Sequence, residues 1–317
     1  VNNPKSIGNN SILCITEDSD NNLWIGTLDG LYKYHRNKNV FERIKIPFEN
    51  SKDKIISSLL YDNVGTIWAG TRSGMVFRIN PKDNQFQSYV TVNEYGKIVF
   101  NSGINNIIQV DNDEYWVAAN ATGINKIIPS KRKIERYIPI IEENGKELLN
   151  TEILSMIKLT DGNIAISTVE NLIYSCDTKL KVCKLLFKAL PTDNVGAFIR
   201  CIGQNKNKKD EIWFGTEGTG LFQYNFRTKQ LFPYNHTNSI IERIANFKTI
   251  YFDKYGMLWL GTNGTGIYHL SPDVKNFYTI LQSRNSNKGL PFSSLRAIFQ
   301  TDLGTLWVGG YGGLALI

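Results

Sequence analysis

One phrase recurs along the whole chain, and this repeat constrains the fold more than any other feature of the sequence. Six tryptophans occur, at positions 24, 68, 116, 213, 259 and 307, and each lies in a copy of the phrase. The copies are LWIGTLDGLYKY (23–34), IWAGTRSGMVFRI (67–79), YWVAANATGINKI (115–127), IWFGTEGTGLFQY (212–224), LWLGTNGTGIYHL (258–270) and LWVGGYGGLALI (306–317). A seventh copy, IAISTVENLIYS (164–175), carries Ala165 in the tryptophan position. The chain therefore contains seven units, spaced by about 47 residues.

The interior of each unit predicts four short strands. In the second unit an apolar pair, Ile56 and Leu59, precedes a polar turn, the tryptophan strand and a last apolar stretch at 85–89. Short strands rich in β-branched and aromatic residues form small antiparallel sheets. Seven such sheets arranged radially make a β-propeller, which leaves only short sheet edges. We therefore predict an all-β, seven-bladed propeller of four-stranded antiparallel blades, as a single domain over residues 1–317.

Small residues in the repeat have structural roles. The turn after the tryptophan strand ends in Gly six times and in Asn171 once, and these residues tolerate the positive φ of a tight hairpin. The residue two places after the tryptophan is Gly in five units, Ala118 in the third and Ser167 in the fourth. This position predicts that neighbouring sheets approach closely, with the tryptophan filling space between blades.

The two ends of the chain depart from the repeat. About eleven residues precede the first strand of the first unit, and the last unit stops inside its third strand, at 313–317. The closing outer strand is therefore missing or lies outside this chain. We expect the chain to be a piece of a longer multidomain protein; alternatively, the seven units straddle two propellers.

Composition excludes several classes of protein. Apolar residues make up 42% of the chain and charged residues 21%, which is ordinary for a folded protein. The formal net charge of +7 is mild for this size and does not by itself imply nucleic acid. No apolar run approaches the roughly 18 to 20 residues of a membrane helix. The opening VNNPKS lacks the features of a secretory signal, so the chain is either cytoplasmic or cut from something longer.

Residues that bind metals or catalyse reactions are scarce. None of the four cysteines forms a CxxC pair, and the three histidines, His35, His236 and His269, are far apart in sequence. The acids Asp18, Asp62 and Asp253 each stand six residues before a tryptophan, where we expect turn capping and not a metal site. The sequence predicts no catalytic residue, metal or cofactor.

The phrase L-W-[IVLAF]-G-T-x-x-G-L, preceded by an Asp-rich turn, resembles the two-component regulator propeller repeat. The resemblance covers essentially all 317 residues and is weakest in the fourth unit, which lacks the tryptophan. It implies the periplasmic sensor region of an inner-membrane hybrid two-component system from gut Bacteroidetes such as Bacteroides. In that family two propellers precede an immunoglobulin-like domain, a membrane helix, a histidine kinase, a receiver and a DNA-binding module. This chain contains none of the later parts.

The resemblance also implies a function and partners. Family members sense glycan breakdown products and control genes for polysaccharide use. This chain would then be non-catalytic and would bind an oligosaccharide or other small glycan. It would contact a neighbouring propeller or immunoglobulin-like domain, work as a homodimer within a parent histidine kinase, and bind no nucleic acid itself. A polysaccharide lyase-like enzyme and a protein-interaction scaffold are the alternatives.

Basic residues recur between the apolar anchors of three first strands. The ligand-binding candidates are Arg200, Lys248 and Arg296, with Asn246 at the entry to the sixth unit and Tyr311 as an aromatic platform. We expect them, together with the loops before the first strands, on the face that bears the turns after the tryptophan strands. The alternative is that each cation pairs with a nearby acid or backbone carbonyl.

Three further patterns need an interpretation. The phrases GTEGTG (215–220) and GTNGTG (261–266) are hairpin turns and not phosphate loops, because neither precedes a helix. Basic clusters at 131–133, 179–184 and 206–209 are either solvated hairpin tips or an interface with another domain. Cys176 and Cys183 flank a hairpin tip and can form a disulfide, whereas Cys14 and Cys201 should be reduced and buried.

Overall fold

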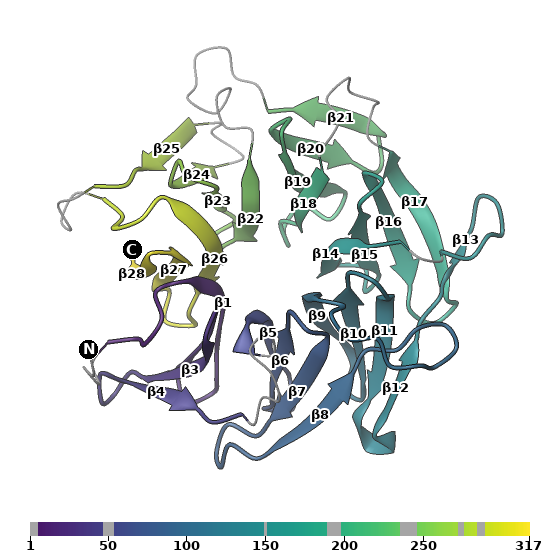
Figure 1. Ribbon diagram of the computed structural model, residues 1–317. Coiled ribbons are helices and arrows are strands. Elements are labelled where there is room, and N and C mark those ends of the chain that lie inside the picture. The colour runs from purple at the N-terminus through teal and green to yellow at the C-terminus, as the bar shows by residue number, and fades with distance from the viewer. Residues whose placement is uncertain are drawn as a thin grey trace. The chain divides into compact units, whose positions relative to one another are not determined.

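A computed structural model describes residues 6–46, 54–148, 151–188, 198–234, 246–271, 276–283 and 289–317. These residues form an all-β, seven-bladed propeller of mostly four-stranded antiparallel sheets, as the repeat predicted (Figure 1). The last sheet has three strands, so the missing fourth strand was also predicted correctly. The described residues contain no α-helix, and no helix there is long and apolar enough to cross a membrane.

Two compact units make up the chain, and the first comprises Val1–Tyr137 with Phe299–Ile317. It holds three complete sheets whose antiparallel strands are neighbours in chain order. Their strands are β1 (Ile12–Glu17), β2 (Leu23–Thr27), β3 (Gly30–His35) and β4 (Val40–Ile44); β5 (Ile56–Tyr61), β6 (Ile67–Thr71), β7 (Met75–Ile79) and β8 (Phe86–Val90); β9 (Ile104–Asp111), β10 (Glu114–Ala119), β11 (Gly123–Ile128) and β12 (Lys133–Arg136). A short 3-10 turn, η2 (Pro129–Lys131), joins β11 to β12, and the unit also contains β27 (Leu306–Tyr311) and β28 (Gly313–Leu316).

The second unit comprises Ile138–Ile298 and also holds three sheets. Their strands are β13 (Ile140–Ile141), β14 (Ile153–Lys158), β15 (Ile164–Thr168), β16 (Leu172–Asp177) and β17 (Val182–Lys188); β18 (Phe198–Gly203), β19 (Glu211–Glu217), β20 (Leu221–Asn225) and β21 (Gln230–Pro233); β22 (Phe247–Phe252), β23 (Leu258–Thr262), β24 (Ile267–Ser271) and β25 (Asn276–Ile280). The seventh sheet has the order β26-β27-β28, with β26 at Ser294–Gln300.

Glycine in the repeated phrase permits close packing between consecutive sheets. Within the first unit β1 contacts β5 and β5 contacts β9, and within the second β14 contacts β18 and β18 contacts β22. A methyl group added at Gly70 would lie 2.5 Å from Ile104 Cγ2, and one at Gly215 would lie 2.6 Å from Phe247 Cβ. Both distances are far below van der Waals contact, so the predicted close approach is confirmed. In the fourth sheet Ser167 occupies this position, and its hydroxyl donates a hydrogen bond to the carbonyl of Ile199 at 3.1 Å.

The turn after the tryptophan strand has the predicted backbone conformation in every sheet. Its last residue has a positive φ in all seven units, for example 93° at Gly74 and 60° at Asn171. The threonine of the repeated phrase stabilises this turn: Thr27 Oγ1 donates to the carbonyl of Gly30 at 2.9 Å. Where the threonine is present, it and the residue with positive φ therefore stabilise a tight hairpin, whose length differs between sheets.

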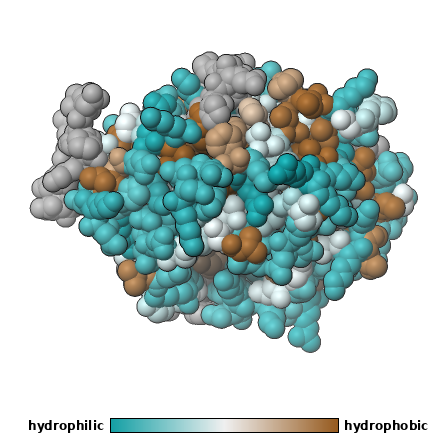
Figure 2. All heavy atoms as spheres, turned by 90° about the horizontal axis from the view of Figure 1, so that it is seen from below, coloured by the Kyte–Doolittle hydropathy of each residue, from teal (hydrophilic) through white to brown (hydrophobic). Residues whose placement is uncertain are grey.

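The core lies between the sheets, and its largest fully buried side chains are Trp24, Trp68, Trp116 and Trp213, whereas Trp259 and Trp307 are partly buried. Trp24 is 0% exposed and packs with Ile56, Ile67 and Phe77 of the following sheet. Ala165, which replaces the ring in the fourth unit, packs instead among aliphatic and aromatic side chains that include Phe214. On the face shown in Figure 2, hydrophilic side chains cover most of the surface, with hydrophobic ones in smaller groups.

The aspartates before the tryptophans do more than cap turns. Asp62 accepts backbone N–H bonds from Val64 and Thr66, as predicted, and also accepts the indole N–H of Trp68 at 2.7 Å. The indole of Trp24 donates to Asp18 and that of Trp259 to Asp253 in the same way. A buried indole N–H without an acceptor is costly, so this carboxylate is part of what allows the ring to be buried.

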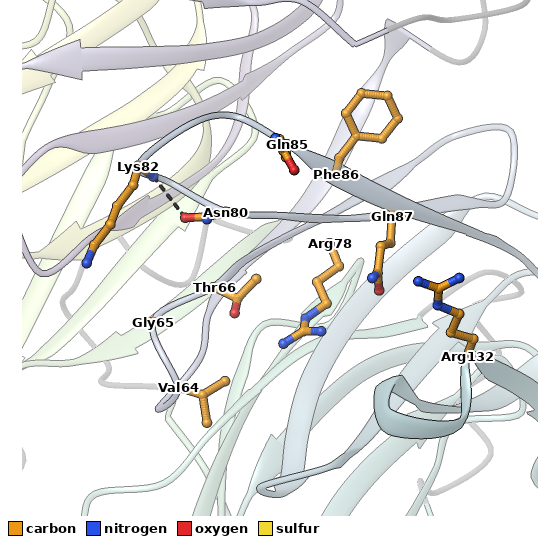
Figure 3. A pocket seen from close by; sticks show the side chains of 10 residues that line it. All are labelled: Val64, Gly65, Thr66, Arg78, Asn80, Lys82, Gln85, Phe86, Gln87 and Arg132. Carbon is orange, nitrogen blue, oxygen red and sulfur yellow. Dashed lines mark hydrogen bonds between the residues drawn. The ribbon is translucent and has the colours of Figure 1, made fainter.

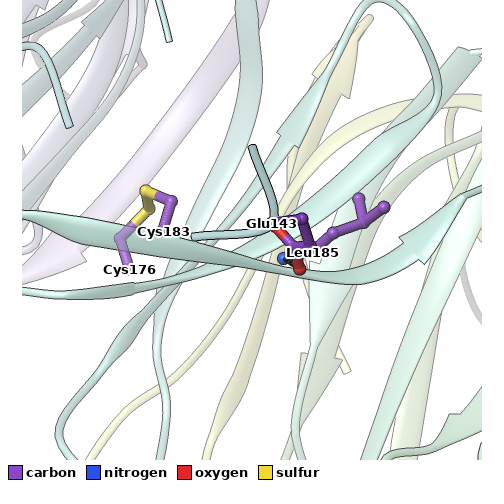
Figure 4. Close-up of a disulfide and its surroundings, with 4 residues drawn as sticks. All are labelled: Glu143, Cys176, Cys183 and Leu185. Atoms are coloured by element: carbon purple, nitrogen blue, oxygen red, sulfur yellow. Dashed lines mark hydrogen bonds between the residues drawn. A yellow bond between two sulfur atoms is a disulfide. The ribbon is translucent and has the colours of Figure 1, made fainter. Parts of the chain in front are cut away.

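The fourth sheet contains an element that the sequence did not predict. Strand β13 pairs in parallel with β17 and adds a fifth strand to the outer edge. The backbone N–H of Ile140 donates to Lys181 O at 2.9 Å, and Glu143 Oε1 accepts the backbone N–H of Leu185 at 2.8 Å (Figure 4). These bonds use groups that an exposed edge strand would leave unpaired.

The predicted disulfide is confirmed in this sheet. Cys176 and Cys183 are paired across the β16–β17 hairpin, with their Cα atoms 4.0 Å apart (Figure 4). Cys14 and Cys201 are free thiols. Cys201 is buried as predicted, and burial raises the pKa of its thiol to about 12. The prediction for Cys14 was wrong in part, because the residue is only partly buried on β1.

We predict that Trp24→Ala lowers the free energy of unfolding by about 3–5 kcal/mol, because the lost ring leaves a cavity between two sheets. Denaturant unfolding measures the change. Tyr95→Ala, which removes an aromatic ring that is 77% exposed, serves as the control and should change stability by less than about 0.5 kcal/mol. Equal unfolding midpoints for Trp24→Ala and wild type would contradict the packing role of the ring.

We predict that replacing Cys176 and Cys183 together by Ala lowers stability by about 2–3 kcal/mol, since the disulfide restricts the unfolded chain. Thermal or denaturant unfolding with and without dithiothreitol provides the measurement. The reductant should destabilise the wild type and leave the double variant unchanged. Identical curves for both proteins under both conditions would show that the bridge does not contribute.

Candidate functional site

Six first strands carry a β-bulge at the same place. In each, one residue of the first strand is skipped between two consecutive pairs with the tryptophan strand. The skipped residues are Leu13, Ser57, Asn105, Leu154, Arg200 and Lys248. A bulge interrupts the regular alternation of side chains and gives one of them a new direction. Two of the three predicted cations therefore occupy a position at which the strand can present a charged group.

Both of these cations bind the same carboxylate in the second unit. Arg200 Nε lies 2.6 Å from Glu217 Oε2, and Lys248 Nζ lies 3.1 Å from Glu217 Oε1. The backbone places the acid: Glu217 ends β19, pairs with Phe198 of β18 and forms a bridge with Asn246 just before β22. The carboxylate therefore connects the first strands of two consecutive sheets.

The electrostatic state of this cluster follows from its partners. Partial burial acts to raise the pKa of Glu217, but the hydrogen bonds and charges of Arg200 and Lys248 outweigh it and hold the pKa below its usual range. The side chains of Arg200 and Glu217 are 36% and 32% exposed, and that of Lys248 is 13% exposed. Solvent screens such pairs, so they contribute little to stability. Within the described residues the guanidinium of Arg200 donates a hydrogen bond to Glu217 alone.

An aromatic ring and a row of polar groups lie beside the charged cluster. The guanidinium carbon of Arg200 is 5.2 Å from the ring centre of Phe198. The carbonyl of Asn246 accepts the backbone N–H of Asn263 at 3.1 Å, and Asn263 Oδ1 accepts the hydroxyl of Ser294 at 2.9 Å. The polar row therefore continues from β18 to the beginning of β26.

The structure brings together three of the five predicted site residues, Arg200, Asn246 and Lys248. Arg296 lies partly buried in β26, and Tyr311 ends β27 in the other unit, where it is 40% exposed. The sequence left open the alternative that each cation pairs with a nearby acid, and the pairing of Arg200 and Lys248 with Glu217 matches it. The loops that we expected around the site fall outside the described residues, at 189–197, 235–245 and 284–288.

Glu217 is the residue of this cluster that the sequence analysis missed. It was read only as part of the GTEGTG turn. The signal that could have found it is its place four residues after Trp213, the position that Tyr311 occupies after Trp307. At that position each side chain lies at the end of the tryptophan strand, next to the start of another first strand.

The histidines do not form a catalytic group in the part of the chain that is described. His35 Nε2 lies 2.7 Å from Glu42 Oε2, and His269 stacks on Trp259 with ring centres 4.6 Å apart. Burial lowers the pKa of His269, with the charge of Asp253 opposing it. His236 falls outside the described residues. No cluster of three His, Cys, Asp or Glu side chains suited to a metal ion occurs among the residues described.

The sequence matches a known repeat family at its first unit. The model of the two component regulator propeller matches residues 6–29, the stretch that contains Trp24. This stretch is similar to the repeat of that family. The resemblance drawn from the repeated phrase is thereby confirmed. The comparison with curated proteins returned no match.

Solved structures share the fold of the whole chain. The extracellular domain assigned to the hybrid two component system BT3049 from B. thetaiotaomicron is similar with a TM-score of 0.79 and 24% identity, over 99% of this chain and 40% of that one. The domain assigned to BT4673 from the same organism gives 0.78 and 20%, over 98% and 39%. The chain thus spans about 40% of the length of these domains. Virginiamycin B lyase from Staphylococcus aureus is similar with a TM-score of 0.71 and 15% identity, over 97% and 96%.

We predict that the stabilising effect of Glu217 depends on pH. Its pKa in the folded protein lies below its unfolded value near 4.5, so the carboxylate stabilises the fold above that pH and loses this effect as the pH falls. The melting temperature of wild type should exceed that of Glu217→Gln by about 1–2 °C at pH 7. The difference should shrink as the pH is lowered from about 4.5.

A thermal melt series from pH 7 to pH 3 provides the measurement. Glu147→Gln, at an exposed position in the same unit, is the matched control and should follow wild type throughout. A constant difference between wild type and Glu217→Gln across the series would contradict the ion-pair account.

Proposed function

We propose that this chain is a non-catalytic, extracytoplasmic sensing module that binds a small glycan. The observation that carries the proposal is the Arg200–Glu217–Lys248 cluster, held at two bulges beside Phe198 and Asn246. Sugar hydroxyl groups both donate and accept hydrogen bonds, and sugar rings stack on aromatic faces. A fixed carboxylate between two cations, next to an aromatic ring and an amide, supplies each of these groups.

The same geometry makes a catalytic role for Glu217 chemically unfavourable. A general base is most effective when its pKa lies near the working pH, whereas the two cations hold the pKa of Glu217 below its usual range. Both oxygens of the carboxylate already accept hydrogen bonds from these cations. Virginiamycin B lyase has a similar fold, but a shared fold alone does not imply a shared catalytic activity.

The comparisons support an extracytoplasmic place for this module. Two of the structures with this fold are extracellular domains assigned to hybrid two component systems, and both are longer than this chain. We propose that residues 1–317 form one periplasmic propeller of a longer, inner-membrane histidine kinase. Glycan binding would pass a signal through a neighbouring propeller or immunoglobulin-like domain, or through a homodimer, to genes for polysaccharide use. The module itself would bind no nucleic acid.

Ligand-driven signalling needs a ligand whose affinity differs between two states of the receiver. The Glu217 cluster is suited to such coupling because it joins consecutive sheets through side chains and not through a continuous strand. A ligand that competes for Arg200 or Lys248 would change the contacts between β18 and β22. The proposal therefore places binding and the transmitted change at the same residues.

We predict that Arg200→Ala and Lys248→Ala each weaken binding of a glycan ligand by at least about tenfold, through loss of a charge-assisted hydrogen bond. Calorimetry against a panel of neutral, uronic-acid and sulfated oligosaccharides identifies the ligand and then measures the loss. Melting temperatures should change by less than about 3 °C, since each ion pair is partly exposed.

Arg227→Ala, which removes an exposed cation from the β20–β21 turn of the same unit, is the matched control and should bind as wild type. Arg296→Ala tests the third predicted cation in the same assay. Unchanged affinity in both Arg200→Ala and Lys248→Ala, or large unfolding shifts in both, would show that these residues are structural ion pairs.

A further inference from the structure

A polar cavity lies in the first unit, at the opposite end of the strands from the β6–β7 turn. Its volume is about 620 Å³, and it is bordered by the β5–β6 turn at 64–66, the β7–β8 hairpin and Arg132 (Figure 3). Three cations line it, Arg78, Lys82 and Arg132, together with the side chains of Asn80 and Gln87. Neither the fold nor the proposed sensing site accounts for this group of charges.

The three cations lack acidic partners within the described part of the chain. No ion pair there includes Arg78, Lys82 or Arg132. Asp62 accepts the indole N–H of Trp68 and the hydroxyl of Tyr115, and Asp113 binds Ser130, so both carboxylates keep their charge. The hydrogen bonds from Ser130, together with the charge of Arg78, lower the pKa of Asp113. Within the described residues the three cations are therefore not held in ion pairs, and their charged groups can meet an anionic ligand.

The fold holds the two arginines toward one space. Arg78 on β7 pairs with Gln87 of β8, and its guanidinium carbon lies 5.8 Å from the ring centre of Trp68. Its Nε is buried with no hydrogen-bond partner among the described residues. Arg132 follows η2 with a left-handed φ of 49°. Figure 3 shows the side chains of Arg78, Gln87 and Arg132 directed toward the same region of the cavity.

The size and lining of the cavity indicate the chemistry of its ligand. Guanidinium groups bind planar oxyanions through paired N–H donors. A volume of about 620 Å³ exceeds what a bare anion needs and falls in the range of small-molecule sites. The amides of Asn80 and Gln87 and the hydroxyl of Thr66 can bind a neutral, hydroxyl-rich body next to the anion.

We propose that this cavity binds an acidic saccharide, with the carboxylate or sulfate group on Arg78 and Arg132 and the sugar body against the amides. The site is separate from the Glu217 cluster, which belongs to the other unit. The cavity gives a role to Arg132, a member of the basic cluster at 131–133. The proposed sensing function does not use this cluster. Binding at one site does not require binding at the other.

The test is a ligand-observed NMR titration of the whole chain with D-glucuronate, glucose 6-sulfate, D-glucose and inorganic sulfate. At least one of the two acidic sugars should bind with a Kd about tenfold or more below that of inorganic sulfate, and D-glucose should not bind measurably. The preference between the carboxylate and the sulfate identifies which oxyanion the site takes. Arg132→Gln, at an exposed turn position, should raise the Kd of the preferred sugar about tenfold, and Arg78→Gln should do the same.

Arg72→Gln removes an exposed arginine of the same unit and is the matched control, with no change expected. Arg200→Ala separates the two sites: a loss in Arg78→Gln and Arg132→Gln but not in Arg200→Ala assigns the binding to this cavity, whereas a loss in Arg200→Ala alone assigns it to the Glu217 cluster and overturns this proposal. Equal affinity for inorganic sulfate and both acidic sugars would indicate an adventitious ion only and would overturn the proposal. So would wild-type affinity in Arg132→Gln, or an equal loss in Arg72→Gln.

Discussion

Close packing of each tryptophan strand on the first strand of another sheet is the constraint on which the structure depends. At Gly70 and Gly215 the backbone of one sheet lies so close to Ile104 and Phe247 of the next sheet that there is no room for an added methyl group. The tryptophan beside each glycine then fills the remaining space. Because several sheets use the same contact, the small residue recurs at the same spacing along the chain, and the ring recurs with it except in the fourth sheet, where Ala165 takes its place. That recurrence is the repeat seen in the sequence.

This packing also determines where chemistry is possible. The first strand cannot be regular where it passes the small residue, and six first strands carry a bulge at that place. The residue at the bulge differs between sheets, from Leu13 and the buried Leu154 to Arg200 and Lys248. In the second unit two such positions are cationic and meet one acid, Glu217. The two cations of the proposed binding site therefore stand at bulges that form where the sheets pack together.

The sequence predicted the features that depend on the period and on single residue types. The seven-fold repeat of short strands, the positive φ at the turn, the buried Trp24 and the Cys176–Cys183 bridge all follow from local rules. The sequence did not predict β13, because a two-residue parallel strand has no periodicity of its own. Nor did it predict the role of Glu217, since that role depends on which residues of two sheets meet. The equivalence of Arg200 and Lys248 was visible in the repeat, whereas their shared acid was not.

The central claim is that the Glu217 cluster binds ligand and is not only an ion-pair network. Hydrogen-exchange mass spectrometry of the protein, with and without the glycan found by the oligosaccharide panel, tests this claim most directly. Slower exchange of the backbone amides at 198–200, 215–217 and 246–249 on ligand addition is the result that the account predicts. Protection confined to other segments, with no change at these three, would contradict it.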